Sequence, residues 1–304
     1  MEQTYNVLIG LWMNNLAENL SLIRSGLDIL DVPKRKGEPV ICVGGGPSLA
    51  KYQHLKMIKK SGWNHPVLSC DRELQNCLKH EILPYAVASV DGNPIIARYY
   101  NHHLVKKYAK DIHAAFAVTV HPNVVRAWRG KIYWFVAMLD HVEAEGKADT
   151  HSKTFLLHLL TKLKGVISGI GNVGSFLWNF AAELGCSPII LVGYDFSEQV
   201  KYKEKAVYWN HFVKMFLQDG KDGETAQDQA AALHQVERNP DFNEYYLVNP
   251  IWKRYQVQLA AHIITSKIHT INATGNGCLH TEAVNCDNFE AMSLEKVLET
   301  YIKR

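Results

Sequence analysis

The chain has 304 residues, of which 47% are hydrophobic, and a net charge of +3 at pH 7. This length and apolar content predict a packed α/β protein, and the nearly balanced charge gives no argument for nucleic acid as the main partner. The sequence shows neither a signal peptide nor an apolar stretch near the length of a bilayer span, so we expect a soluble protein without a membrane span. Its six cysteines form no Cys-x-x-Cys pair, which is typical of the reducing cytoplasm and predicts no structural zinc.

Two segments precede the first predicted core strand. Residues 5–30 carry apolar side chains at helical spacing and predict an amphipathic helix, whose apolar face could also serve as a dimer surface in a homo-oligomer. Residues 33–39, with prolines, a glycine and a basic triplet, predict a linker. We therefore expect an N-terminal helix and linker over 1–36, a Rossmann-like core over 37–200 and a helical annex over 201–304, whose final strand and helix return to the core.

The stretch Val40–Leu49 is a short apolar run followed by the three glycines Gly44, Gly45 and Gly46. Such a run predicts a buried parallel strand, and residues without a Cβ let a ligand approach the backbone amides. Pro47 suits the first turn of a following helix, and Ser48 can cap its free N–H groups. Amides at the positive end of a helix favour an anion such as phosphate, although a tight turn without a ligand has similar requirements. The loop lacks the Gly-Lys-Ser/Thr end of a P-loop.

Further strands and helices alternate after this loop, which predicts a largely parallel sheet with right-handed crossovers. Ligands of such sheets bind at the carboxyl ends of the strands, where Asp71, Asp91 and His121 also fall. Asp71 could meet a base or a ribose hydroxyl, or cap a helix; Asp91 could hold a metal or position an acceptor, or be a plain turn acid. The expected strands are Val67–Cys70, Tyr85–Val90, Ala114–Val120 and Ile132–Val136, with helices at Arg72–His80 and Phe155–Leu163.

A second glycine loop contains Gly169, Gly171 and Gly174 in a G-x-G-x-x-G pattern, and a strand over Ile189–Val192 then ends at Asp195. This pattern alone would allow a dinucleotide-dependent oxidoreductase, but the strand before it is short and the motif lies in mid-chain. Gly171, Asn172 and Ser175 would form a second loop facing the ligand. Asp195 is a candidate general base or ligand anchor, with a turn-stabilising carboxylate as the alternative.

The remaining chain is expected to form the annex over the carboxyl edge of the sheet. It contains the loop Ala273–His280, whose His280 is a catalytic candidate near neutral pH, as are His121 and His211. Most of the fifteen histidines are expected to be packed or surface residues. The expected elements are helices at Lys201–Gln218, Tyr245–Lys267 and Leu294–Ile302, a loop or loose helix at Asp219–Asn243 and a strand at His269–Asn272.

The patterns VGGGPSL (43–49), SCDRELQNCLKHEILPYAVASVDGNP (69–94) and ISGIGNVGSFLWNFAAELGCSPIILVGYDF (167–196) resemble the 6-hydroxymethylpterin diphosphokinase MptE-like family. The N-terminal residues Trp12, Asn15 and Asn19 and the late INATGNG (271–277) are more similar to its motility-accessory-factor (Maf) glycosyltransferase branch. The resemblance covers nearly the whole chain and implies a Rossmann-like fold related to that of bacterial sialyltransferases.

The resemblance implies a transferase that moves a nonulosonic sugar, of the sialic, pseudaminic or legionaminic type, from a CMP-sugar to an acceptor. An alternative is a pterin diphosphokinase using ATP and magnesium, and another is a nucleotide-binding protein without catalysis. The diphosphokinase branch carries a Thr-Asp-Leu-Asp-Gly cluster, whereas this chain keeps only Asp91 of the two acids and has Ser89 in place of the first. One carboxylate is a poor match for Mg-ATP, so magnesium, held by Asp91, is expected only if the reaction depends on it. The partner is then a nucleotide or nucleotide-sugar.

Overall fold

The computed structural model describes residues 2–138, 152–168, 171–199, 235–248 and 250–302. The chain divides into two compact units. The first unit contains Met1–Gly45, Leu55–Ile189 and Tyr301–Arg304, and the second contains Gly46–His54 and Ile190–Thr300.

The first unit is built on a parallel sheet with the strand order β1-β6-β5-β4-β3-β2, and β7 pairs with β6. Strands β2, β3 and β4 are buried along their whole length, which is the pattern of a sheet covered on both faces. The strands are β1 (Leu27–Asp28), β2 (Val40–Val43), β3 (Val67–Cys70), β4 (Ala86–Ser89), β5 (His113–Ala117), β6 (Ile132–Ala137) and β7 (Val166–Ile167).

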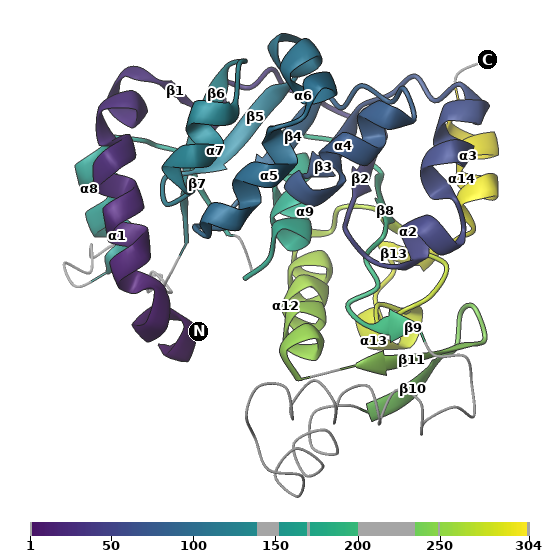
Figure 1. Cartoon of the computed structure of the whole chain (residues 1–304). Coiled ribbons are helices and arrows are strands. Elements are labelled where there is room, and N and C mark those ends of the chain that lie inside the picture. The colour runs from purple at the N-terminus through teal and green to yellow at the C-terminus, as the bar shows by residue number, and fades with distance from the viewer. Residues whose placement is uncertain (1, 139–151, 169–170, 200–234, 249, 303–304) are drawn as a thin grey trace, which may run out of the picture. The chain divides into compact units, whose positions relative to one another are not determined.

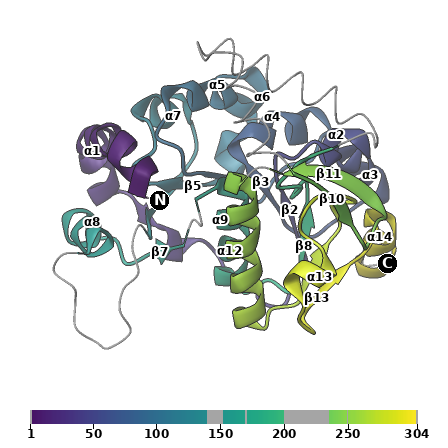
Figure 2. The same cartoon turned by 90° about the horizontal axis from the view of Figure 1, so that it is seen from below.

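Helices cover both faces of this sheet. Figures 1 and 2 show α4, α5, α6 and α7 on one face and α9 on the other, while α1 and α8 lie side by side near β6 and β7. No helix in the described part of the chain combines the length and the apolar content needed to cross a membrane. The helices are α1 (Glu2–Ser25), η1 (Ile29–Asp31), α3 (His54–Ser61), α4 (Asp71–Lys79), η2 (Pro94–Ile96), α5 (Ala97–Tyr100), α6 (His103–Tyr108), η3 (Ala109–Asp111), α7 (Pro122–Ala127), α8 (Lys153–Thr161) and α9 (Val173–Glu183).

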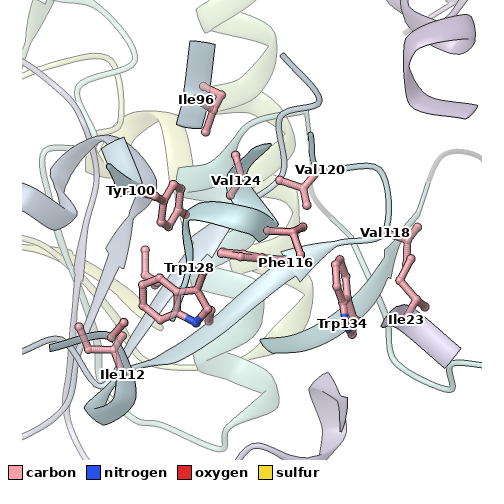
Figure 3. Close-up of a cluster of buried hydrophobic side chains, with 14 of the residues drawn as sticks. Ile23, Ile96, Tyr100, Ile112, Phe116, Val118, Val120, Val124, Trp128 and Trp134 are labelled. Atoms are coloured by element: carbon pink, nitrogen blue, oxygen red, sulfur yellow. The ribbon is translucent and has the colours of Figure 1, made fainter. Parts of the chain in front are cut away.

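Aromatic side chains fill the core between α4–α7 and the sheet (Figure 3). The rings of Tyr100, Phe116 and Trp128 meet edge to face with centroids 5.4–6.0 Å apart, and Phe116 also contacts Trp134. Ile23 brings α1 into the same cluster. Such edge-to-face contacts add to the stabilisation from burial, so α1 is attached to the sheet by its apolar side.

The second unit contains parallel and antiparallel strands. Strand β8 neighbours β12, which pairs in parallel with β13, and a separate antiparallel sheet has the order β10-β11-β9. The elements are α2 (Ser48–Lys51), β8 (Ile189–Val192), β9 (Glu198–Gln199), β10 (Gln235–Asn239), β11 (Glu244–Val248), α12 (Pro250–Ser266), β12 (Thr270–Asn272), α13 (Thr281–Val284), β13 (Phe289–Ala291) and α14 (Leu294–Tyr301).

The predicted class, a mostly parallel α/β fold with flanking helices, is confirmed. Three element predictions need correction. The N-terminal helix ends at Ser25, because Gly26 and the short strand β1 follow it. The segment expected to be loop or loose helix contains β10, and the helix expected from Tyr245 begins at Pro250, after β11. The helix predicted over Lys201–Gln218 lies outside the described residues.

Candidate functional site

In the second unit, the segment Gly46–Ser48 at the end of the glycine loop is tied to a buried carboxyl group. Asp195 follows β8 and is 1% exposed, and Ser48, at the start of α2, is fully buried. The backbone N–H of Ser48 donates to Asp195 Oδ1 at 3.1 Å, and the Ser48 hydroxyl donates to Oδ2 at 2.6 Å. The Ser48 hydroxyl bond is at the short end of the usual range for O–H···O bonds. Asp195 therefore holds the start of α2 in place.

This geometry changes the predicted role of Ser48. The N-cap residue Pro47 makes no side-chain hydrogen bond to α2. The Ser48 hydroxyl donates to Asp195 and does not cap the helix amides. Asp195, which is distant in the sequence, caps the helix instead by accepting a hydrogen bond from the Ser48 N–H. Because α2 has only four residues, its dipole contributes little, and anion binding at this loop depends on backbone amides.

The loop glycines have different surroundings. The Gly46 N–H donates to Gly193 O at 2.9 Å, and a Cβ on Gly46 would lie 1.9 Å from Asp195 Oδ2. Glycine is thus required at position 46 by the close approach of the carboxylate. The amides of Gly44 and Gly45 have no acceptor among the described residues, and Gly45 is partly exposed. Gly44 is buried, so the Gly45 amide is the donor of this pair that the loop can offer to a ligand.

A second loop, Ala273–His280, packs against the residues that follow β8. The Cys278 N–H donates to Asp195 O at 3.0 Å, and Gly277, with φ +96°, leaves no room for a Cβ beside the Asp195 backbone. The loop is held from the other side by Asn239, whose Nδ2 donates to Gly277 O at 2.7 Å. The two loops also meet directly after β8 and β12, where the Tyr194 N–H donates to Thr274 Oγ1 at 3.1 Å.

These two loops carry buried polar atoms without partners. Ser197 Oγ, Asn276 Oδ1 and His280 Nδ1 are shielded from solvent and form no hydrogen bond with any described residue. Ser197 is 4% exposed, Asn276 0% and His280 9%. Nearly all buried polar groups in proteins have a partner in the protein, in ordered water or in a ligand. The edge of the sheet after β8 and β12 is therefore suited to a ligand rich in hydrogen-bonding groups.

His280 is placed there by the loop, at the N-cap of α13. Burial lowers the pKa of its imidazole, against the opposing effect of Asp241, and Lys253 lowers it further. Its neutral form is thus favoured near pH 7, which is the form that can accept a proton.

In the first unit, Asp71 lies at the end of β3 and is 5% exposed. Its Oδ2 accepts the Ser89 hydroxyl at 2.8 Å, and its Oδ1 accepts the Arg72 N–H at 2.7 Å. Burial raises the pKa of Asp71 from 3.8 to about 6, although both hydrogen bonds oppose the shift. Ser89, the residue in the position of the missing family acid, thus contacts Asp71 directly.

Asp91 is exposed and its Oδ1 accepts the Asn93 N–H at 2.9 Å, which is an Asx turn. Within the described ranges, no group of three or more histidine, cysteine, aspartate or glutamate side chains is placed to hold a metal ion. Magnesium binding by Asp91 remains a prediction. His121 caps α7 through Nδ1, and His211 lies outside the described residues.

The second glycine loop has a capping role at α9. Asn172 Oδ1 accepts the Ser175 N–H at 2.9 Å, and Asn172 Nδ2 donates to Ser175 Oγ at 2.8 Å. Gly171 has φ +78°, a conformation that glycine adopts readily. Gly169 lies outside the described residues. A ligand-facing role for Gly171, Asn172 and Ser175 remains a prediction.

No sequence motif assigns a role to Ser197, Asn276 or Asn239. The same holds for a charged group formed by Glu237 and Tyr246 of the antiparallel sheet and Lys253 of α12. In that group Glu237 Oε2 accepts the Tyr246 hydroxyl at 2.8 Å and Lys253 Nζ at 3.0 Å. The Asn239-Pro240-Asp241 sequence is a turn signal that would have indicated the β10–β11 hairpin. No local signal pointed to the burial of Ser197.

The order of the strands and the glycine loop at a strand end define a Rossmann-like α/β protein. The model of the family described as 6-hydroxymethylpterin diphosphokinase MptE-like matches residues 12–201, and the chain belongs to this family, as the motifs predicted. The fold is similar to that of the Maf glycosyltransferase from Magnetospirillum magneticum AMB-1, with a TM-score of 0.59 and 14% identity. The match covers 94% of this chain and 38% of that one, so this chain spans well under half of the neighbour's length. Comparison with curated proteins gives no match.

Proposed function

We propose that this protein is a transferase that binds a nucleotide-activated sugar and transfers a nonulosonic sugar from a CMP-sugar to an acceptor. The observation that carries the proposal lies in the second unit, where buried Asp195 holds the segment Gly46–Ser48 and the neighbouring loops contain three buried polar atoms without partners among the described residues. A sugar nucleotide offers a phosphate for the amides and many hydroxyl and amide groups for these atoms. Family membership and the Maf-like fold support the same class.

In the proposed reaction the acceptor hydroxyl oxygen attacks the anomeric carbon and forms the new glycosidic bond. The bond from that carbon to the phosphate oxygen breaks, and CMP leaves with the electron pair. The Gly45 amide, which is partly exposed, would stabilise the charge on the leaving phosphate, as preorganised N–H donors do for other developing anions. Asp195 would act indirectly, because its carboxylate holds Ser48 and the loop.

The proton of the acceptor hydroxyl needs a base. Neutral His280 is our first candidate, because burial favours its uncharged form and its Nδ1 has no partner among the described residues. Asp91 is the second, because it is exposed and follows a strand of the parallel sheet. A base role for Asp195 would require it to release Ser48.

The test is a thermal-shift panel of CMP, CDP, UDP, GDP, ATP and NAD, each with and without magnesium, followed by assay of CMP release from CMP-sugars. A ligand at one hundred times its dissociation constant stabilises the native state by about 2.7 kcal/mol. We expect a shift with cytidine nucleotides that needs no magnesium and is reduced by Ser48→Ala. The exposed substitution Ser25→Ala is the control and should leave the shift unchanged. A protein that binds none of these nucleotides would contradict the proposal.

A pterin diphosphokinase is the alternative, favoured by the description of the family. Asp91 is exposed, and Ser89, which replaces the first family acid, bonds to Asp71. Both observations speak against a paired-carboxylate magnesium site. An ATP shift that disappears with a chelator would favour the kinase. Nucleotide binding without turnover, unaffected by Asp91→Ala or Asp195→Ala, would favour a protein that binds without catalysis.

A further inference from the structure

The N-terminal helix of the first unit reaches into the loops at the carboxyl edge of its sheet. Asn15 of α1 is 3% exposed, and its Nδ2 donates to Gly92 O at 2.9 Å and to Thr119 O at 3.0 Å. Gly92 belongs to the loop after β4 and Thr119 to the loop after β5. One amide group therefore joins two neighbouring strand-end loops.

Two further residues of α1 strengthen this connection. Asn19, 1% exposed, donates its Nδ2 to Val120 O at 2.8 Å. Trp12 lies against Gly92 so closely that a Cβ at this glycine would be 2.8 Å from Trp12 Cδ1. Residues 12, 15 and 19 follow the i, i+3, i+7 spacing of one helix face. This face of α1 is thus shaped to the two loops.

The held loops carry two of the candidate site residues. Gly92 is next to Asp91, whose side chain closes the Asx turn with Asn93, and Val120 is next to His121. A buried amide is costly unless it is hydrogen-bonded, and an apolar side chain would have served for packing α1 alone. The bonds from Asn15 and Asn19 instead fix backbone carbonyls adjacent to the candidate residues. The geometry of these hydrogen bonds determines the positions of Asp91 and His121.

We propose that Asn15 is a positioning residue of the active site, which acts by holding the Asp91 loop to the loop before His121. The inference rests on the proposed function, because it presumes that Asp91 acts on a ligand. It assigns α1 a role in catalysis in addition to packing. Small displacements of a reacting group are known to reduce rates by about 100-fold.

The test compares Asn15→Ala with Leu16→Ala in the full chain. Leu16 is its neighbour on α1, is equally buried at 3% exposure and packs in the core without bonding either loop. We expect both variants to lower the Tm. Only Asn15→Ala should lower kcat for CMP-sugar turnover, by about 10- to 100-fold, with a smaller change in KM. Hydrogen exchange of residues 91–93 and 118–121 should rise in Asn15→Ala and stay near wild type in Leu16→Ala.

Equal losses of kcat in the two variants, or an unchanged kcat in Asn15→Ala, would overturn the proposal. If Asn15→Ala does not fold, Asn15→Ser, which has one hydroxyl donor in place of the amide that bonds both Gly92 O and Thr119 O, takes its place. If the wild type binds nucleotide but turns over no CMP-sugar, the proposed transfer reaction is wrong, whereas the positioning role of Asn15 can still be tested. Nucleotide affinity then decides: a selective loss in Asn15→Ala supports positioning, and equal affinities contradict it. A wild type that binds no nucleotide overturns both proposals.

Discussion

Ser48 and Asp195 are 147 positions apart, and Ser48 donates both its backbone N–H and its hydroxyl to the Asp195 carboxylate. Both residues are buried, so this contact belongs to the interior of the second unit and not to its surface. It fixes the backbone that follows the glycine loop relative to the loop after β8. Asp195 would therefore position a ligand held by this loop without contacting the ligand itself.

Replacing Ser48 by alanine should destabilise the protein. The change removes the 2.6 Å bond to Asp195 Oδ2, and leaving a buried acceptor without its donor costs about 1–3 kcal/mol. We expect a Tm lower by several degrees and weaker binding of cytidine nucleotides. Ser25→Ala, an exposed serine bonded to its own helix, should change the free energy of unfolding by less than about 0.5 kcal/mol. Equal effects of the two substitutions would show that the contact is not a stabilising one.

The adjacent glycines provide a matched pair. A Cβ at Gly46 would overlap Asp195 Oδ2 and lie 2.7 Å from Gly193 O, whereas a Cβ at Gly45 would lie 3.2 Å from Cδ of the flexible Arg72 side chain. Gly46→Ala should therefore cost about 1–3 kcal/mol, as overpacking does, and Gly45→Ala much less. Urea unfolding of both variants measures the difference. A Gly45→Ala protein less stable than Gly46→Ala would contradict the geometry.

Patterns confined to neighbouring residues predicted most of the parallel sheet. Strands β3 and β8 have the predicted bounds, because short apolar runs between polar residues leave little freedom in where a buried strand ends. The motifs also identified the family. The Ser48–Asp195 contact could not be predicted, because it depends on which distant loop closes over the turn. Local spacing instead assigned the Ser48 hydroxyl to the helix amides that follow it.

The antiparallel sheet was missed for a different reason. Strand β10 pairs Glu237 with Tyr246 of β11, and four of its five residues, Gln-Val-Glu-Arg-Asn, are polar. A mostly polar strand such as β10 contains no apolar run that would identify it. The pattern of residues 245–248 in β11 is compatible with the first turn of the helix that follows. The same hairpin carries Asn239, which no chemical motif marks.

Asn239 joins this hairpin to the loop Ala273–His280, so its removal should affect both. Its Nδ2 donates to Gly277 O, and its Oδ1 accepts the N–H groups of Asp241 and Phe242. Because the side chain is fully buried, Asn239→Ala should cost about 2 kcal/mol or more in the free energy of unfolding. Arg238→Ala removes only an exposed contact with Asn243 in the same hairpin and is the control, with an expected change within about 0.5 kcal/mol. Similar denaturation midpoints for both variants would contradict the role of Asn239.

The last prediction concerns the buried carboxyl of Asp71. Burial raises its pKa from 3.8 to about 6, so the folded state favours the protonated acid. The stabilisation from this group is complete below pH 3.8 and is lost as the pH rises through 6, by up to about 3 kcal/mol. Asp71→Asn cannot ionise and can keep bonds with Ser89 and the Arg72 N–H. The unfolding free energy of the variant minus that of the wild type should therefore increase between pH 4 and pH 7, by about 3 kcal/mol at most. Urea unfolding at several pH values measures this difference, and Asp111→Asn, at an exposed aspartate, controls for the loss of one charge. A difference that is constant across this range would show that Asp71 ionises as it does in the unfolded chain.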